Sequence, residues 1–443
     1  MISSSAKDRR SIAIVGGGLA GMAAAVAAVE RGFHVTLFER GPALGGRAGS
    51  FRDPKLGRLV DLCPHVAMGC CTELLDFCRR TGIDGRFARH RVLHFFGPDG
   101  RRYDFAAVGW LPAPLHLLPG LMRLGYLTLR DRGSIVRAML RLVRTSPGDD
   151  GATIGRWLRE QHQSQRAIER FWTVVLVSAL GDTVDRVSRS AARKVFIDGF
   201  LGSRDAYEVL VPQVPLGQLW REIHAWLVAH GVEIHLRRGV AQVEGDSRRA
   251  TGIVLADGSR QEFDHVIAAV SWRQIGRLLC PALRSALPEL ARIEEIEPSP
   301  ITAVHLRFDR RLSPLPHAAI VGRLSQWVFQ RSAEPHYEVV ISASHGLLGR
   351  PHSETVSEVL ADLATIWPDV RDAELLGSRV VTQPAAVFSV RPGIDRLRPG
   401  QKTAVSNLFL AGDWTSTGWP ATMEGAVRSG RMALESIPPI PNP

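Results

Sequence analysis

The chain has 443 residues, 45% of them hydrophobic and 22% charged, with a formal net charge of +11. This length provides enough core for two or three domains. Only four of the 55 basic residues are lysine, and there is neither a block of five or six like charges nor a basic–aromatic alternation. These features argue against a nucleic-acid-binding protein. No run approaches about 18 apolar residues, so no transmembrane helix is expected.

Two further features indicate a cytoplasmic protein. The opening residues, MISSSAKDRR, resemble a short polar tail rather than a signal peptide. The five cysteines are an odd number, which does not suggest a disulfide framework.

Residues 11–39 carry a dinucleotide-binding pattern. An apolar strand over 11–15 runs into Gly16-x-Gly18-x-x-Gly21, an alanine-rich helix to residue 31 and a second strand over 34–38. Glu39 ends that strand, where an acid binds the hydroxyls of an unphosphorylated ribose and disfavours NADP. The helix N-terminus would face the phosphates. The expected binding residues are Gly16, Gly18, Leu19, Ala20, Gly21, Glu39 and Arg40.

A second glycine loop follows at Leu44-Gly45-Gly46-Arg47. Its glycines let the chain pass close to a cofactor, and Arg47 offers a forked cation to a phosphate or an acid. NAD-dependent enzymes have no general need for this loop. With it, the chain resembles the FAD-dependent amine oxidase and phytoene desaturase superfamily, which implies FAD as the cofactor and Gly45, Gly46 and Arg47 as further contacts.

The C-terminal region has a matching pattern. Residues 407–413 read as a strand that feeds a turn at Gly412-Asp413, and a helix is expected to open at Thr422-Met423-Glu424. Its N–H groups would stabilise negative charge on a reduced flavin. The resemblance implies that Asp413 lies beside the ribityl and pyrophosphate part of FAD, and that the backbone of Val240 meets the adenine.

The segment GDWTSTGWPATMEGAVRSG, which ends at Gly430, is similar to the ending of the squalene-associated desaturases, the hydroxysqualene dehydroxylases. The segments at 60–72, 171–188 and 211–217 have the same resemblance. The chain departs from that family at Leu62 and Pro64, where an Asn and a Gln are common. The resemblance implies reductive dehydroxylation of hydroxysqualene to squalene, in squalene and hopanoid biosynthesis.

The separated motifs predict an α/β fold in which a discontinuous Rossmann-like FAD-binding domain of the GR2 type carries an inserted α+β substrate domain. The FAD domain is expected over 1–100, 217–297 and 391–443. The substrate domain is expected over a mostly helical part, 101–216, and a part with a sheet and a helix, 298–390.

The chemistry predicts an acid near the flavin. A hydroxyl group is a poor leaving group, so either an acid protonates it or an electrostatic pocket tolerates a carbocation-like allyl group, while reduced flavin gives hydride. His65 and Asp61 are the candidates for that acid or its orienting partner, although His65 could be a core histidine and Asp61 could support its loop. Trp419 either walls the isoprenoid slot or fills the core. An external reductant must restore the flavin.

Three alternative functions have weaker support. A carotenoid-type desaturase would run the same machinery in reverse on a long polyene. An amine oxidase would need an aromatic cage, for which Trp414 and Trp419 are the nearby aromatic residues. A non-catalytic prenyl-binding protein is disfavoured by the intact Glu39, Arg47 and Asp413.

Four cysteines, Cys63, Cys70, Cys71 and Cys78, lie close together in the sequence with His65 among them. Their spacing lacks the short chelating loop of zinc sites, so no metal site is expected. The helical period of Cys71, Leu74, Leu75 and Cys78 indicates small buried hydrophobic residues instead.

The segment 110–129 is apolar, is punctuated by prolines and is bordered by arginines. It either dips into the face of a bilayer, which would make the protein peripheral on the inner side of the membrane, or forms an ordinary helix of the substrate domain.

Overall fold

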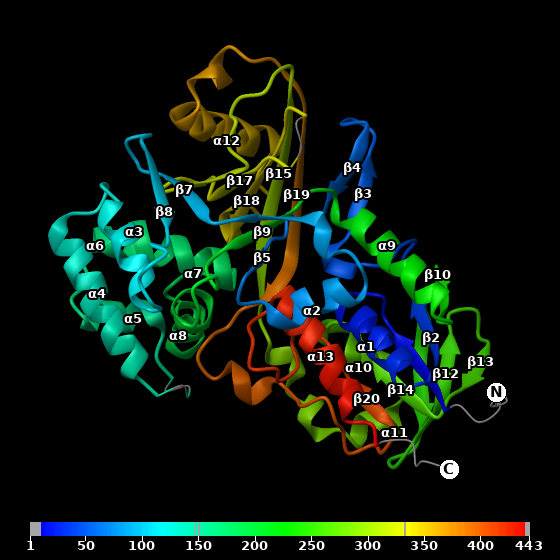
Figure 1. Ribbon diagram of the computed structural model, residues 1–443. Helices are drawn as coiled ribbons and strands as arrows, with labels where there is room; N and C mark the ends of the chain where they lie inside the picture. Colours follow the sequence, from blue (N-terminus) through cyan, green and yellow to red (C-terminus); the bar gives the residue numbers. More distant parts are fainter. Residues whose placement is uncertain (1–9, 147, 149–150, 332–333, 439–443) are drawn as a thin grey trace.

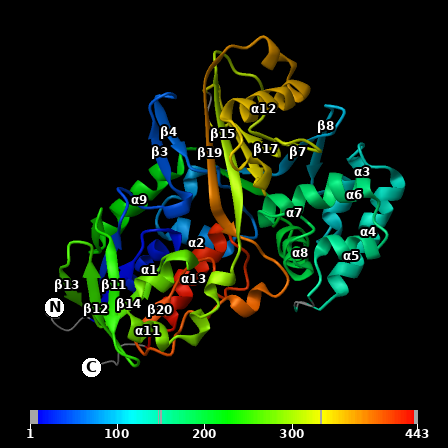
Figure 2. The same cartoon turned by 180° about the vertical axis from the view of Figure 1, so that it is seen from behind.

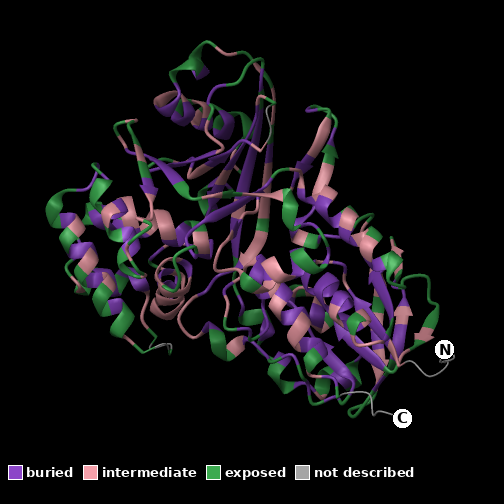
Figure 3. Cartoon of the chain, in the orientation of Figure 1, coloured by how far each residue is buried: buried purple, intermediate pink, exposed green. Residues whose placement is uncertain are grey.

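The computed structural model describes residues 10–146, 148, 151–331 and 334–438. It has three parts: a parallel-sheet domain, a tall mixed sheet, and a group of helices on the far side of that sheet (Figures 1 and 2). Buried residues concentrate in the strands, whereas the outer faces of the helices are exposed (Figure 3).

A five-stranded parallel sheet forms the centre of the first part. Its strand order draws on three separated stretches of the chain: β10 (Glu233–Leu236), β2 (His34–Glu39), β1 (Ser11–Val15), β14 (His265–Ala268) and β20 (Leu408–Leu410). The predicted discontinuous Rossmann-like domain is therefore confirmed.

The two faces of this sheet follow from side-chain alternation along the buried strands. Ile12 and Ile14 pack against one set of helices, and Ala13 and Val15 face the other side. The first face is covered by α1 (Leu19–Glu30), α9 (Leu216–Ala229) and α13 (Met423–Glu435), with α2 (Thr72–Arg80) against α13. The second is covered by the antiparallel strands β11 (Val240–Gly245), β12 (Ala250–Leu255) and β13 (Arg260–Glu262), together with α10 (Trp272–Leu278) and α11 (Pro281–Ser285).

The tall sheet has seven strands and is antiparallel except where β16 meets β7. In order they are β19 (Leu375–Phe388), β15 (Pro298–Phe308), β18 (His336–Ser342), β17 (Trp327–Phe329), β16 (His317–Ile320), β7 (Val92–Phe96) and β8 (Arg102–Ala106). Helix α12 (His352–Ile366) packs its apolar stripe on one face, against Val304, Leu306 and Val339. The other face is turned toward the remaining two parts.

The helical part contains α3 (Leu118–Arg123), α4 (Leu129–Arg144), α5 (Ile154–Glu160), α6 (Gln165–Ala167), α7 (Thr173–Leu180) and α8 (Arg189–Phe196). Two small sheets join the parts: β3 (Ser50–Asp53) pairs with β4 (Arg58–Asp61), and β9 (Val209–Pro212) lies between β5 (Ala67–Met68) and β6 (Phe87–His90). Thr128 begins α4 with a reciprocal capping box to Asp131.

Two features of the substrate part differ from the expectation. The boundary placed at residue 100 divides the β7–β8 hairpin, both of whose strands belong to the tall sheet. Strand β19, the 14-residue edge of that sheet, was not predicted, because its residues alternate weakly and include Pro384. Pairing with β15 along nearly its full length stabilises it.

Candidate active site

A cavity of about 1190 Å³ runs from the parallel sheet toward the tall sheet and the helices. Its lining joins both ends of the chain. Of the predicted cofactor contacts, those on the lining are Gly16, Gly18, Leu19, Ala20, Glu39, Arg40, Gly45, Gly46, Arg47, Val240, Gly412, Asp413, Thr422 and Met423.

The first glycine turn shapes one end of the cavity. Gly16 has a φ of +113°, and a Cβ there would lie 2.5 Å from the carbonyl oxygen of Ala269. A Cβ on Gly21 would lie 1.9 Å from the carbonyl oxygen of Gly16. Gly21 is not on the lining; it lets α1 pack against β1, as the sequence predicts. The first turn of α1 consequently faces the cavity, where its free N–H groups suit a pyrophosphate.

Glu39, at the end of β2, holds the first glycine turn in place through its carboxylate. Its carboxylate accepts hydrogen bonds from the backbone N–H groups of Gly17, at 2.8 Å, and Gly41, at 2.6 Å. The carboxylate is thereby held at the cavity edge in the position expected for a ribose contact.

Arg47 and Asp413 join the two ends of the chain. Their side chains form an ion pair of 2.5 Å, and Asp413 is almost fully buried. Arg47 also donates to the carbonyl oxygen of Ala386 and lies 5.5 Å from the ring centroid of Trp272. The loop that follows the first glycine motif is thus fixed to the C-terminal glycine turn and to β19.

The N-terminus of α13 faces the same cavity. Thr422 caps this helix by accepting a hydrogen bond from the N–H of Gly425, and Met423 and Ala426 line the cavity beside it. Ser429 accepts a hydrogen bond from the N–H of Gly412, which ties the helix to the glycine turn. The helix end can therefore stabilise an electron-rich ring in the cavity.

His65 is the predicted catalytic residue that lines the cavity. Its Nδ1 lies 2.8 Å from the carbonyl oxygen of Cys63, so Nδ1 carries the hydrogen. Nε2 makes no hydrogen bond to the described residues. Removal from water lowers the pKa of His65, and the backbone hydrogen bond to Cys63 opposes this effect.

Besides Gly21, three predicted site residues are not on the cavity lining: Asp61, Glu424 and Trp419. Asp61 is fully buried in an ion pair with Arg331 and accepts hydrogen bonds from Ser50 and the N–H of Leu216. Its carboxylate is engaged in joining the domains and makes no hydrogen bond with His65. Of the roles expected for Asp61, the structure agrees with support of its loop and not with a proton donor in the cavity or a direct partner of His65.

Glu424 and Trp419 also need correction. The carboxylate of Glu424 accepts hydrogen bonds from the N–H groups of Glu73 and Leu74, so it stabilises the start of α2 instead of lining the cavity. Trp419 stacks under the ammonium group of Lys194, which lies 4.4 Å from its ring centroid. This contact joins the loop before α13 to α8 of the substrate part. Neither residue is on the cavity lining.

Two supporting residues were not predicted. Trp220 donates from Nε1 to the carbonyl oxygen of Ala48, 2.6 Å away, and supports the loop at Gly45. Arg398 is buried and donates to the carbonyl oxygens of Asp413, Thr415 and Trp419. No local sequence pattern identifies either residue. Arg398 in particular is one of many isolated arginines in this chain.

The predicted buried face of the cysteine helix is confirmed at Leu74 and Cys78, whereas Cys71 and Leu75 are half-buried. Cys78 and Leu74 are buried on one face of α2, and Cys71 precedes its first turn. Burial raises the pKa of the Cys78 thiol to about 12, which suits an inert core residue.

The far half of the cavity is apolar. Every charged side chain on its described lining comes from the parallel-sheet domain, namely Glu39, Arg40, Arg47, Arg273, Arg277 and Asp413. The tall sheet and α7 contribute mainly aliphatic and aromatic groups: Leu93, Phe95, Val174, Val175, Leu180, Ile301, Trp327, Phe329, Val340 and Val387. The polar groups from these elements are Ser178, Ser342 and Gln383.

The family model for flavin-containing amine oxidoreductases matches residues 19–437. The chain belongs to this family. The cofactor is accordingly FAD, and the glycine turns, Glu39 and the Arg47–Asp413 pair fit its phosphates, ribose and ribityl part.

Curated relatives include carotenoid desaturases and a dehydroxylase at similar identity. A probable zeta-carotene desaturase of Synechococcus elongatus is 26% identical over 96% of this chain and 98% of its own length. A hydroxysqualene dehydroxylase of Zymomonas mobilis is 26% identical over 95% of this chain and 97% of its own length. The predicted superfamily is thereby confirmed, and these relatives are oxidoreductases by name.

Solved structures share the fold. An oxidoreductase from Methanosarcina mazei has a TM-score of 0.73 at 19% identity and covers 96% of this chain and 100% of its own. Cyclohexylamine oxidase from Brevibacterium oxydans has a TM-score of 0.71 at 18% identity and covers 97% of this chain and 98% of its own.

Within the described residues, no helix combines the length and hydropathy needed to cross a bilayer.

Proposed function

We propose that the protein transfers hydride from reduced flavin to a long apolar isoprenoid, and that its substrate is hydroxysqualene. The observation that carries this proposal is the uncharged far half of the cavity, which begins at the flavin contacts and continues between the tall sheet and α7. A chain of isoprene units gains about 25 cal/mol for each Å² of apolar surface that it buries in such a channel.

The reaction replaces a carbon–oxygen bond with a carbon–hydrogen bond. Hydroxysqualene and reduced flavin give squalene, water and oxidised flavin; the hydroxyl takes one proton and leaves as water, and the allylic carbon takes hydride. When bound and reduced, FAD supplies that hydride. The chain's own residues must hold the substrate, exclude water and protonate the hydroxyl.

His65 is the residue that we assign to the proton. It lies on the cavity lining, and its Nε2 makes no hydrogen bond to the described residues, which leaves Nε2 to meet a substrate hydroxyl. A histidine whose pKa lies below its usual value is a stronger acid once it is protonated. The aliphatic wall around it keeps competing water from the allylic carbon.

A carotenoid-type desaturase is the second candidate, since the desaturases match at the same identity. Two observations favour the dehydroxylase. The alignment with the dehydroxylase is 432 residues long and that with the Synechococcus desaturase is 479, although both cover nearly the same share of this chain. The desaturase alignment therefore contains more gaps. In addition, the C-terminal segment that contains Gly412 and Asp413 resembles the dehydroxylases.

An amine oxidase has less support. A cationic amine would find no carboxylate on the described lining contributed by the tall sheet. Trp414 is fully buried and donates to the carbonyl oxygen of Val270, so it does not form a cage with Trp419. The non-catalytic alternative is disfavoured because Glu39, Arg47 and Asp413 all line the cavity.

The test uses the flavin-loaded protein without oxygen. Photoreduced protein mixed with hydroxysqualene is expected to regain the oxidised flavin band and to form squalene. Oxidised protein mixed with phytoene serves as the second arm and should keep its flavin band. Bleaching by phytoene, with no squalene in the first arm, would move the assignment to the desaturases.

We also propose that the segment 110–129 contacts an anionic lipid surface. Its exposed side chains include Trp110 and Leu129, which are 80% and 77% accessible, and Leu115, Leu118 and Met122 are exposed as well. The segment contains no acidic residue, includes the exposed Arg123 and is followed directly by the exposed Arg130. Helix α3 and the start of α4 lie on the far side of the molecule from the parallel sheet (Figure 1).

This contact is testable by sedimentation with vesicles of neutral or anionic phospholipid. The wild-type protein should bind the anionic vesicles more tightly, because each basic residue near such a surface contributes about 1 kcal/mol. The double variant W110E/L129E should lose binding, whereas L348E, which changes an exposed leucine outside the segment, should retain it. Equal binding by the two variants would contradict the contact.

A further inference from the structure

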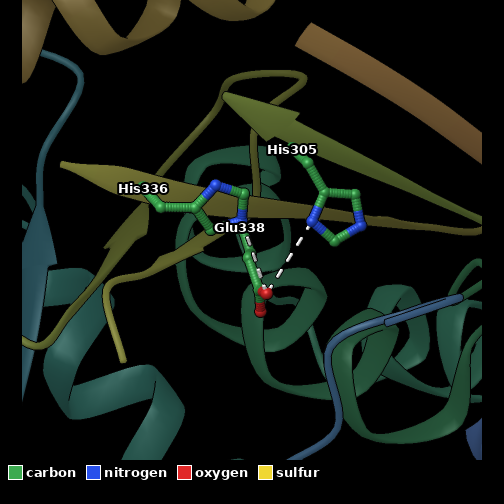
Figure 4. Close-up of side chains that lie close together, drawn as sticks. All are labelled: His305, His336 and Glu338. Atoms are coloured by element: carbon green, nitrogen blue, oxygen red, sulfur yellow. Dashed lines mark ion pairs between the residues drawn. The ribbon is translucent and has the colours of Figure 1, made fainter. Parts of the chain in front are cut away.

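A second group of ionisable side chains lies outside the flavin cavity, in the tall sheet. The register of β15 and β18 sets His305 directly opposite Glu338, and His336 lies two residues before Glu338 on the same strand face. The three residues are between 0% and 6% exposed, and none of them is on the cavity lining. Figure 4 shows the two imidazole rings turned toward the carboxylate of Glu338.

The distances between these groups are unusual for hydrogen bonds. His305 Nδ1 and His336 Nε2 each lie 3.7 Å from Glu338 Oε1, and the three candidate ligand atoms lie within 4.8 Å of one another. Hydrogen bonds between such atoms are about 2.7–3.2 Å long. Ligand atoms around a tetrahedral zinc ion with bonds of about 2.0–2.1 Å lie roughly 3.4 Å apart, which is close to the spacing here.

The hydrogen bond on the other side of His305 fixes its tautomer. His305 Nε2 lies 2.9 Å from the backbone carbonyl oxygen of Asp61, which can only accept, so Nε2 carries the hydrogen. Nδ1 then presents a lone pair to the carboxylate of Glu338. Metal-binding histidines are typically held in this way, with the second ring nitrogen donating to a carbonyl or carboxylate. Neither ring nitrogen of His336 has a hydrogen-bond partner among the described residues.

The charges around the group also favour a cation. Arg331 is buried between Asp61 and Glu338, and its guanidinium lies 2.8 Å from Glu338 Oε2. Two carboxylates and one guanidinium leave an excess negative charge among buried side chains, which is costly. Because Arg331 contacts Oε2, the other oxygen of Glu338 remains available to a ligand. A proton or a metal ion could supply the positive charge, and the 3.7 Å separations favour the metal ion.

We propose that His305, His336 and Glu338 bind one divalent metal ion, with zinc as the ion best suited to two imidazoles and a carboxylate. Water would fill the fourth position. None of the three residues lines the flavin cavity, so the role of the site is structural. Through His305 it holds the backbone carbonyl of Asp61, whose side-chain carboxylate accepts a hydrogen bond from the N–H of Leu216 at the start of α9. The metal would thereby fix the tall sheet to the parallel-sheet domain.

The experiment uses the flavin-loaded full chain after treatment with a chelator. Titration with Co²⁺ is expected to give the visible absorption of a four-coordinate ion at wavelengths beyond the flavin bands, with one ion bound per chain. Zn²⁺ should displace the Co²⁺ and raise the midpoint of thermal unfolding. Loss of a hydrogen bond that merely supports a metal ligand weakens metal binding by roughly 10–100-fold. H336Q and E338Q remove ligands themselves, so they should weaken Co²⁺ binding by more than this. H116Q is the control, since His116 is also buried with unpartnered ring nitrogens but lies outside the group.

The wild-type titration decides the proposal even where a variant does not fold. A stripped wild-type protein that takes up no Co²⁺ at one equivalent, and whose unfolding midpoint does not respond to Zn²⁺, overturns the metal site. The same conclusion follows if H336Q binds Co²⁺ as tightly as the wild-type protein and H116Q. The excess charge would then be carried by a proton shared between His336 and Glu338.

Discussion

Individual side chains in this protein act at long sequence separations. Arg47 and Asp413 are 366 residues apart, and their ion pair closes the flavin site from both ends of the chain. The carboxylate of Glu424 accepts a hydrogen bond from the N–H of Glu73 at the start of α2, and these two residues are 351 residues apart. That the first two residues meet at the cofactor site was predictable, because each belongs to a recognisable glycine motif, although their ion pair was not predicted. The contact of Glu424 with α2 was not predictable, because a glutamate at a helix N-terminus has the same appearance whether it faces a cofactor or another helix.

Replacing Asp413 with Asn should weaken flavin binding by about 10- to 100-fold. The substitution leaves the guanidinium of Arg47 without its carboxylate, and truncation of a largely buried charge pair costs on the order of 2 kcal/mol. Flavin release on dilution, followed by fluorescence, measures the change. E244Q, which breaks a more exposed pair with Arg260 in the antiparallel strands, is the matched control. Equal flavin affinity in the two variants would contradict the assignment of Asp413.

The pH dependence of turnover should follow His65. Its pKa is lowered by removal from water, so the imidazole is mainly neutral at pH 7 and gains a proton as the pH falls. The rate of dehydroxylation should therefore increase as the pH is lowered from 8. It should level off only at a pH below about 6.5, the usual pKa of histidine. H65Q should lose about 10²-fold or more in rate and should flatten the profile.

The control for this profile is H230Q, which changes an exposed histidine at the end of α9. A rate that rises with pH in the wild-type protein would indicate a base instead of an acid at position 65. An unchanged profile in H65Q would exclude His65 as the proton donor.

At the scale of helices and strands, the close approach of α13 to α1 builds the site. Gly430 is the contact point, since a Cβ there would lie 2.1 Å from the carbonyl oxygen of Ala20. The strand–glycine–helix units were predictable because neighbouring residues determine them. The parallel pairing of β7 with β16 was not, since it joins Phe96 to Ile320 and only the folded sheet brings these residues together.

G430A should destabilise the protein by about 1–3 kcal/mol, because the added methyl group forces α13 away from α1. G133A is the matched control. Gly133 lies in α4, where an added methyl group would meet no atom within 4 Å beyond its own helix, and the substitution should gain about 0.5–1 kcal/mol from higher helix propensity. Urea unfolding measures both changes. A stable G430A would contradict the tight contact between these helices.

In the whole molecule, a cofactor site with several charged side chains adjoins an uncharged channel. The parallel-sheet domain supplies every charged group on the described lining, and the tall sheet and α7 supply the apolar surface. Glycine spacing and the family resemblance predicted most of the first half, because binding of the cofactor phosphates and ribose requires glycines and an acid at fixed spacing. Arg273 and Arg277 were not predicted, and Glu424 was expected on the lining but caps α2 instead. The second half was predicted only by resemblance, since apolar residues in strands look alike whether they line a channel or a core.

The most direct test follows the transferred hydrogen. Flavin-loaded protein, photoreduced in D₂O without oxygen, is mixed with hydroxysqualene, and the squalene is analysed by mass spectrometry. Hydride transfer from the cofactor predicts squalene with one deuterium at the carbon that lost its hydroxyl, formed in proportion to the oxidised flavin. Failure to form squalene, or squalene without deuterium while the flavin stays reduced, would contradict the proposed function.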